Sequence, residues 1–207
     1  MKFVKTSVGS IHWAETGIKD GAPVLFSNSL GTDFRIWDRV LPLLPKGLRI
    51  IRYDKRGHGL SDCNGRDYSM ADHVADAAAV LDAAGAKDAI VVGLSIGGMI
   101  AQGLAAERPD LVRGVVLCNT GAKIGTPEMW ADRIKAVEAG GIAALEDSIL
   151  ERWFSKRFRA EEVGELALWR NMLVRTTLDG YAGSSAAIAE TDLHESMSLL
   201  RIPAVAL

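Results

Sequence analysis

The segment Gly93-Leu94-Ser95-Ile96-Gly97 restricts the fold of this chain more than any other feature. It follows an apolar run, residues 89–94, and it precedes a stretch that we expect to be helical from 96 to about 107. A serine between two glycines at such a junction is typical of a tight, strained turn from strand to helix. Larger side chains two residues before and after the serine would collide in that turn, so glycine is needed at both positions.

Apolar runs of strand length recur along the first 120 residues. They occupy residues 23–28, 48–53, 89–94 and 112–118, after an opening hairpin over residues 2–15. Between them, Ser69 and Asp72 have the spacing of a capping box, and Gly85 ends the helix that they begin. Uninterrupted apolar runs are typical of parallel strands that are buried on both faces. Strands alternating with helices predict an α/β fold with a doubly wound, mostly parallel sheet.

The pattern changes after residue 122. Several helical stretches follow between 126 and 191, one of them predicted over 161–175, and strand character returns only at 202–207. We therefore expect three parts: an α/β core over 1–122, a helical lid over 123–196 inserted after the sixth strand, and a return to the core over 197–207 that stops within a strand.

Composition argues against several classes of function. The chain has 24 basic and 26 acidic residues, a formal net charge of −2, so no basic surplus favours nucleic acid or a membrane surface as a partner. Cys63 and Cys118 lack C-x-x-C spacing, and we expect neither a disulfide framework nor a metal site. The sequence shows no signal peptide and no apolar stretch of about eighteen residues, so we expect a cytoplasmic protein.

The turn at Ser95 predicts a chemical role. A helix N-terminus directs free backbone N–H groups and a partial positive charge at the serine hydroxyl. In such a fold the N–H after the serine and one N–H from the loop after the first buried strand form an oxyanion hole. We assign these donors to Ile96 and Leu30, with Ser95 as nucleophile. The alternatives are a chance glycine-rich turn and an ordinary polar loop over 27–32, since both patterns are common. Nucleotide-binding glycine motifs are missing.

Two further observations make a resemblance specific. Asp54–Ser61 has the form D-x-R-G-H-G-x-S and, together with the turn at Ser95, resembles the α/β-hydrolase superfamily. Many relatives carry His-Gly after the first buried strand, where this chain has Asn28-Ser29. Other segments, spread over essentially the whole chain, resemble the 3-oxoadipate enol-lactonases: residues 27–32, 93–98, 152–154, 180–183 and 186–188.

This resemblance implies a serine hydrolase that opens 3-oxoadipate enol-lactone to 3-oxoadipate in the β-ketoadipate pathway of aromatic degradation. Ser95 would attack the lactone carbonyl and form an acyl-enzyme, which water then releases. The leaving group is an enol, which is more acidic than an alcohol, so its departure needs less proton assistance. No cofactor and no metal is implied, and the partner is a small lactone or ester.

The substrate carries a carboxylate, so we expect a cation in the pocket. Arg133 is the candidate, three residues after Trp130 on a helix of the lid, and we place both residues in the substrate site. An arginine whose stem packs over the apolar stripe, or which pairs with a nearby acid, is the alternative.

The match to the family fails at the C-terminal end. The family's catalytic acid follows the strand that begins near Ala204, and its histidine comes later, so we expect both of them, with further strands and helices, to be missing here. His58 precedes Ser95, whereas the order in this fold is serine, acid, histidine. Asp192 and His194 precede the last strand and are poor substitutes. We expect the chain alone to be almost inactive.

Three explanations are open: an N-terminal piece completed by a complementary C-terminal fragment, a truncated sequence, or a natural non-catalytic relative. Two other functions are open as well, because fold alone does not determine function. One is another α/β hydrolase, such as a carboxylesterase, a C–C hydrolase or a cofactor-free haloperoxidase. The other is a binding protein on the same scaffold.

Overall fold

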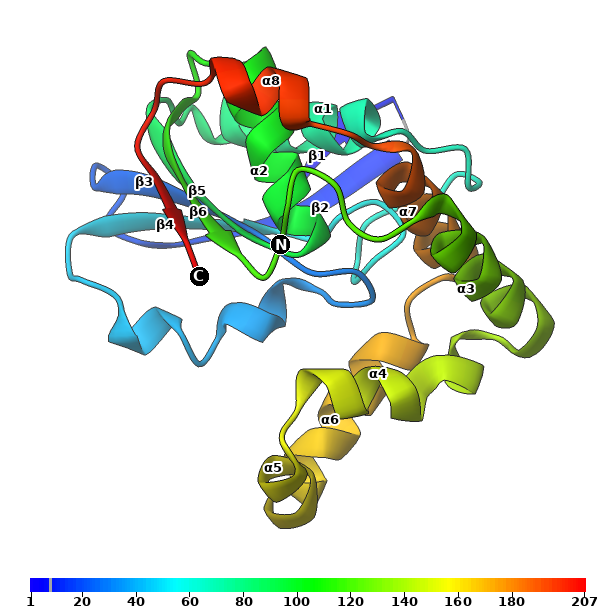
Figure 1. Ribbon diagram of the computed structural model, residues 1–207. Coiled ribbons are helices and arrows are strands. Elements are labelled where there is room, and N and C mark those ends of the chain that lie inside the picture. The colour runs from blue at the N-terminus through cyan, green and yellow to red at the C-terminus, as the bar shows by residue number, and fades with distance from the viewer. Residues whose placement is uncertain (8) are drawn as a thin grey trace.

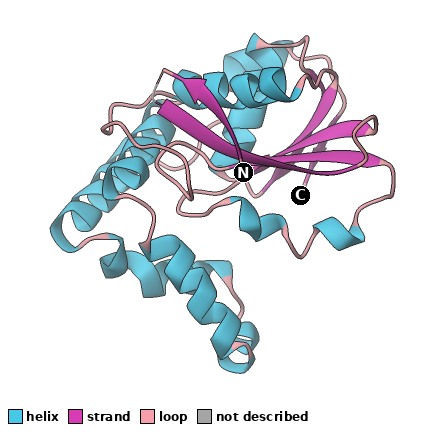
Figure 2. Cartoon of the chain, turned by 180° about the vertical axis from the view of Figure 1, so that it is seen from behind, coloured by secondary structure: helices cyan, strands magenta, loops and turns pink. Residues whose placement is uncertain are grey.

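The computed structural model describes residues 1–7 and 9–207, and in them seven strands form one mixed sheet (Figures 1 and 2). The strands are β1 (Lys2–Thr6), β2 (Gly9–Gly17), β3 (Ala22–Ser27), β4 (Leu48–Tyr53), β5 (Ala89–Leu94), β6 (Val112–Cys118) and β7 (Ala204–Ala206). They lie in the order β1-β2-β4-β3-β5-β6-β7. The opening hairpin pairs antiparallel, and the four pairs from β4 to β7 are parallel, as the α/β prediction requires.

The predicted helices are present, and their ends follow local signals. α1 (Met70–Ala84) begins at a capping box, in which the Ser69 hydroxyl accepts from the Asp72 N–H at 3.2 Å and the Asp72 carboxylate accepts from the Ser69 N–H at 2.9 Å. Gly85 ends it with a φ of +61°. α2 (Ile96–Glu107) follows β5 after Ser95, as predicted.

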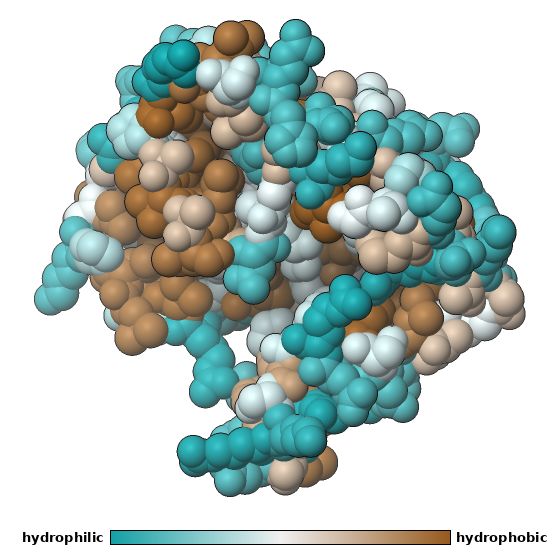
Figure 3. Space-filling model, viewed as in Figure 1, coloured by the Kyte–Doolittle hydropathy of each residue, from teal (hydrophilic) through white to brown (hydrophobic). Residues whose placement is uncertain are grey.

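The two faces of the sheet are covered differently. α1 and α2 lie on one face of the sheet with α8 (His194–Leu199) (Figure 1). The larger cluster of buried apolar side chains joins these helices, the strands and part of the lid. The other face carries two short 3₁₀ helices, η1 (Phe34–Trp37) and η2 (Leu41–Leu43), over a smaller apolar cluster. Several apolar residues packed against this smaller cluster are only partly buried. Apolar residues also gather on the molecular surface near β7 (Figure 3).

Helices occupy the region after β6, as predicted for the lid. They are α3 (Pro127–Gly140), η3 (Ile142–Leu145), α4 (Glu146–Trp153), α5 (Lys156–Glu161), α6 (Val163–Val174) and α7 (Leu178–Glu190). The helix predicted over 161–175 is α6, but Glu161 itself ends α5, because Glu162 leaves helical geometry at φ −107° and ψ 46°. Figure 1 shows α4, α5 and α6 standing away from the sheet, whereas α3 and α7 lie closer to it.

The start of α7 is anchored on the core. The N–H and the hydroxyl of Thr177 both donate to the carbonyl of Gly57, at 3.3 and 2.9 Å. A Cβ on Gly57 would lie 2.3 Å from Cα of Gly180, so the two backbones touch only because both residues are glycines. The predicted boundaries of core and lid, at 122 and 196, stay a prediction. Within the described part of the chain, no helix is long and apolar enough to cross a bilayer.

Candidate active site

Ser95 lies in the strained turn between β5 and α2. Its φ of +56° and ψ of −120° belong to a region that non-glycine residues rarely adopt. A Cβ on Gly93 would lie 2.2 Å from the carbonyl oxygen of Gly97, and a Cβ on Gly97 would lie 2.1 Å from that of Ser27. Both glycines are therefore required by collisions with backbone, which is the steric reason that the sequence suggested.

The backbone of Ser95 is held while its hydroxyl is free. The Ser95 N–H donates to the carbonyl of Cys118 at 3.0 Å, and the Ser95 carbonyl accepts from the Thr120 hydroxyl at 2.6 Å. The side chain is half-buried and forms no hydrogen bond with any residue that the structure describes. Ile96, the first residue of α2, has an N–H without a partner in the helix, as the first N–H groups of any helix do. This arrangement can present a nucleophile beside a free backbone donor.

The loop after β3 lies next to this turn. β3 and β5 are parallel neighbours, and Ser27 pairs with Gly93, so both strands deliver their following loops to the same edge of the sheet. Asn28 anchors the loop: its amide nitrogen donates to the carbonyl of Tyr53 at 3.1 Å, and its amide oxygen accepts from Trp37 Nε1 at 2.9 Å. Leu30, the second predicted donor, follows in this loop, and its side chain is buried.

His58 is unsuited to act as a general base on Ser95. It is 1% exposed, its Nδ1 donates to the carbonyl of Arg56 at 2.9 Å, and its Nε2 accepts from the N–H of Gly31 at 3.0 Å. Burial lowers the pKa of His58 well below its usual value, so the ring is neutral. Both nitrogens are occupied, as expected for a structural turn.

The other histidines also have different surroundings. His12 Nδ1 lies 2.8 Å from a carboxylate oxygen of Asp54, and His194 is exposed beside Asp192. His73 is buried in the core. Within residues 1–7 and 9–207, no histidine and no carboxylate forms a hydrogen bond with the Ser95 side chain.

Arg133 and Trp130 lie together on α3, and a tyrosine connects them to the loop after β3. Arg133 Nε donates to the hydroxyl of Tyr181 at 2.8 Å, and the guanidinium carbon lies 5.6 Å from the ring centroid of Trp130 and 5.7 Å from that of Tyr181. A Cβ on Gly31 would lie 3.2 Å from Cε2 of Tyr181. Among the described residues Arg133 has no acidic partner, so its terminal nitrogen atoms can bind an anion.

The role of Tyr181 was missed by the reasoning from sequence. Tyr181 is 1% exposed, and burial raises the pKa of its hydroxyl while the nearby Arg133 lowers it. Its position within residues 180–183, a segment that carried the resemblance, was the only signal. Trp130 is also buried, and its Nε1 donates to the carbonyl of Ile124 at 2.7 Å.

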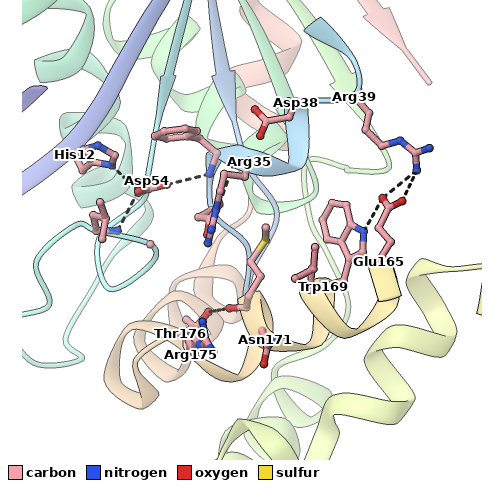
Figure 4. A pocket seen from close by; sticks show the side chains of 16 residues that line it. His12, Arg35, Asp38, Arg39, Asp54, Glu165, Trp169, Asn171, Arg175 and Thr176 are labelled. Atoms are coloured by element: carbon pink, nitrogen blue, oxygen red, sulfur yellow. Dashed lines mark hydrogen bonds and ion pairs between the residues drawn. The ribbon is translucent and has the colours of Figure 1, made fainter. Parts of the chain in front are cut away.

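A separate cleft is lined by other residues. A cleft of about 940 Å³ lies between the residues after Leu30 and helix α6 (Figure 4). Arg39 and Glu165, which face each other across it, form an ion pair of 3.0 Å, and Trp169 packs beside them. None of the five predicted site residues lines this cleft. In the described residues, no group of three or more His, Cys, Asp or Glu side chains could hold a metal ion.

Comparison with known proteins finds a matching family and similar relatives. Residues 22–140 match the family described as alpha/beta hydrolase fold. The chain is 34% identical over 189 residues to 3-oxoadipate enol-lactonase 1 of Acinetobacter baylyi, which covers 90% of this chain and 70% of the relative. It is 30% identical over 194 residues to 3-oxoadipate enol-lactonase 2 of the same organism, covering 94% and 73%.

A solved structure is similar over almost the entire chain. The enol-lactonase from Burkholderia xenovorans LB400 superposes with a TM-score of 0.95 at 33% identity, covering 99% of this chain and 80% of that one. The resemblance inferred from the sequence motifs is thereby confirmed.

Proposed function

Since the chain belongs to the α/β-hydrolase family, we propose that it is a serine hydrolase in which Ser95 opens 3-oxoadipate enol-lactone to 3-oxoadipate. The observation that carries the proposal is the strained turn at Ser95, with a free hydroxyl and the N–H of Ile96 beside the loop of Leu30. The names of the relatives support the substrate. The proposal also includes a cytoplasmic location and a role in the degradation of aromatic compounds.

The reaction follows from these groups. The Ser95 oxygen attacks the lactone carbonyl, and the negative charge that develops on the carbonyl oxygen is stabilised by the N–H groups of Leu30 and Ile96. The ring C–O bond then breaks, and the general base that took the serine proton passes it to the departing enolate oxygen. The resulting enol tautomerises to the ketone, while its carbon chain stays attached through the acyl group on Ser95. Water hydrolyses this ester, which releases 3-oxoadipate and restores the serine.

The general base and its acid belong, in this proposal, to residues outside the 207, either in a longer chain or in a complementary C-terminal fragment. In its support, none of the described histidines or carboxylates bonds to Ser95, and a serine hydroxyl needs a base to become a good nucleophile. The isolated chain is expected to be almost inactive for the same reason.

Arg133 and Trp130 form the substrate's carboxylate site in this proposal. The guanidinium lies beside two aromatic rings, its Nε donates to Tyr181, and among the described residues it has no acidic partner. Its two terminal nitrogens would donate two parallel hydrogen bonds to the substrate carboxylate. Tyr181, which is buried, lies beside Gly31 in the loop of Leu30, and this supports a carboxylate site near the proposed oxyanion hole.

The nucleophile is tested by intact mass spectrometry of the native protein before and after a fluorophosphonate probe. We expect one adduct on the wild type and on the control Ser148→Ala, an exposed serine of α4, but none on Ser95→Ala. A native mass above that of 207 residues would support an external base. Normal turnover by a protein that takes up no probe would contradict the assignment of Ser95 as nucleophile. Normal turnover by a species of only 207 residues would contradict an external base.

The substrate is tested by comparing the enol-lactone with a neutral p-nitrophenyl ester. Arg133→Ala should raise KM for the lactone and leave the neutral ester unaffected, whereas Arg157→Ala, which removes an exposed arginine, should change neither. Equal effects of Arg133→Ala on both substrates would favour another α/β hydrolase, such as a carboxylesterase. A protein that neither takes up the probe nor turns over would be a non-catalytic relative.

A further inference from the structure

The loop that carries Leu30 is held by two side chains from the turn after β4. Lys55 is completely buried, and its Nζ donates to the carbonyl oxygen of Ser29 at 2.8 Å. His58 accepts from the N–H of Gly31 at 3.0 Å. These two hydrogen bonds are formed one residue before and one residue after Leu30.

The hydrogen bond from Lys55 is made to the same peptide unit that contains the proposed oxyanion donor, the N–H of Leu30. The carbonyl of Ser29 and the N–H of Leu30 belong to one planar trans peptide, in which the C=O and N–H bonds point in opposite directions. A donor that holds the carbonyl on the buried side therefore directs the Leu30 N–H away from Lys55. Hydrogen bonds in series also polarise one another, so a bond to the Ser29 carbonyl strengthens the Leu30 N–H as a donor.

Resting on the proposed function of Ser95, we propose that Lys55 and His58 are positioning residues, which orient the Leu30 N–H for the oxyanion of the tetrahedral intermediate. Lys55 orients the Ser29–Leu30 peptide and polarises its N–H. His58 holds the next peptide, so that Leu30 cannot rotate independently of Gly31. Neither side chain needs to touch the substrate.

A purely structural anchor would not require a lysine here. The hydroxyl of Thr32 also donates to the Ser29 carbonyl, at 2.8 Å, so a neutral donor already satisfies that oxygen. Burying an amine is costly, and burial lowers the pKa of Lys55 to about 7, against the opposing effect of Asp54 and Asp33. The amine donates whether it is charged or neutral, and strongly shifted groups are concentrated at functional sites.

The experiment measures binding of phenylboronic acid, which forms a tetrahedral adduct with a serine hydroxyl and places an oxygen in the oxyanion hole. The native protein is titrated by calorimetry, together with Ser95→Ala, Lys55→Met, His58→Leu and His58→Gln. Lys87→Met is the matched control, since Lys87 is exposed. Urea unfolding shows which variants are folded, and the amide signal of Leu30 is followed by NMR.

We expect Lys55→Met and His58→Leu to bind about tenfold more weakly or worse, since complete loss of one oxyanion donor costs about 10² to 10³ in rate. His58→Gln, whose amide oxygen can accept from Gly31, should recover to within about threefold. In the wild type the Leu30 amide proton should move downfield on adduct formation, and in Lys55→Met it should not. The two side chains hold different peptides, so either variant tests the positioning role if it is folded.

Two results would overturn the inference, and they are distinguishable. If the boronic acid binds through Ser95 but both variants bind as the wild type does, the positioning role is wrong and the proposed function is unaffected. If Ser95→Ala binds the boronic acid no more weakly than the wild type, the proposed function fails and the positioning role fails with it.

Discussion

Gly97→Ala is the most direct test of the strained turn, and Gly164→Ala is its matched control. Each glycine is the second residue of a helix, Gly97 in α2 and Gly164 in α6. A Cβ on Gly164 would meet nothing within 4 Å, whereas a Cβ on Gly97 would lie 2.1 Å from the carbonyl oxygen of Ser27. The two substitutions therefore share the same helix-propensity effect and differ in the collision.

The magnitudes follow from these contacts. Alanine stabilises a helix over glycine by up to about 1 kcal/mol, so Gly164→Ala should be more stable than the wild type by roughly 0.5–1 kcal/mol. Gly97→Ala gains the same amount but must separate two buried backbones, and overpacking of this kind costs about 1–3 kcal/mol. The upper end applies because a carbonyl between β3 and its loop cannot turn aside. We expect the two variants to differ by about 3 kcal/mol.

Urea unfolding followed by tryptophan fluorescence measures this difference. With an m-value of about 2 kcal/mol/M, a difference of 3 kcal/mol separates the midpoints by about 1.5 M. If Gly97→Ala unfolds at the same urea concentration as Gly164→Ala, or at a higher one, the steric account of the turn is wrong. Because Ser27 leads into the loop of Leu30, Gly97→Ala should also lose the fluorophosphonate adduct.

Two further predictions concern the pH dependence of stability. His73 is buried, its ring nitrogens have no partner in the described residues, and burial lowers its pKa to about 3. Between about pH 6.5 and 3 only the unfolded chain binds this proton, so the wild type should lose up to about 1.4 kcal/mol per pH unit there. Urea midpoints at pH 7 and 5 should show a smaller loss for His73→Leu, and equal losses would contradict the reasoning. Lys55, whose pKa is lowered to about 7 by burial, affects the pH dependence of stability in the basic range. Only the unfolded chain carries its proton between pH 7 and about 10.5, so wild-type stability should rise with pH relative to Lys55→Met, and a constant gap between pH 7.5 and 9 would refute this.

Much of the fold was predictable because its signals are local. The strands between residues 22 and 118 were predicted to within one residue, since buried parallel strands are continuous apolar runs bounded by turn residues. The start of α1 was readable from Ser69 and Asp72, whose contacts lie within one turn. The error at Glu161, where two helices meet, concerns a boundary that no proline marks, and the nearby Gly164 lies already within the second helix.

The sequence by itself determined the turn at Ser95, because Gly93 and Gly97 are required by collisions that follow from a tight strand-to-helix connection. Tertiary structure alone decided what surrounds it. The hydroxyl of Tyr181 reaches Arg133 across 48 residues, and the amine of Lys55 reaches the Ser29 carbonyl across 26. Such contacts depend on how strands and helices pack, and neither side chain carries a pattern that encodes its distant partner. A lysine and a histidine in a polar turn are unremarkable until the fold buries them beneath the loop of Leu30.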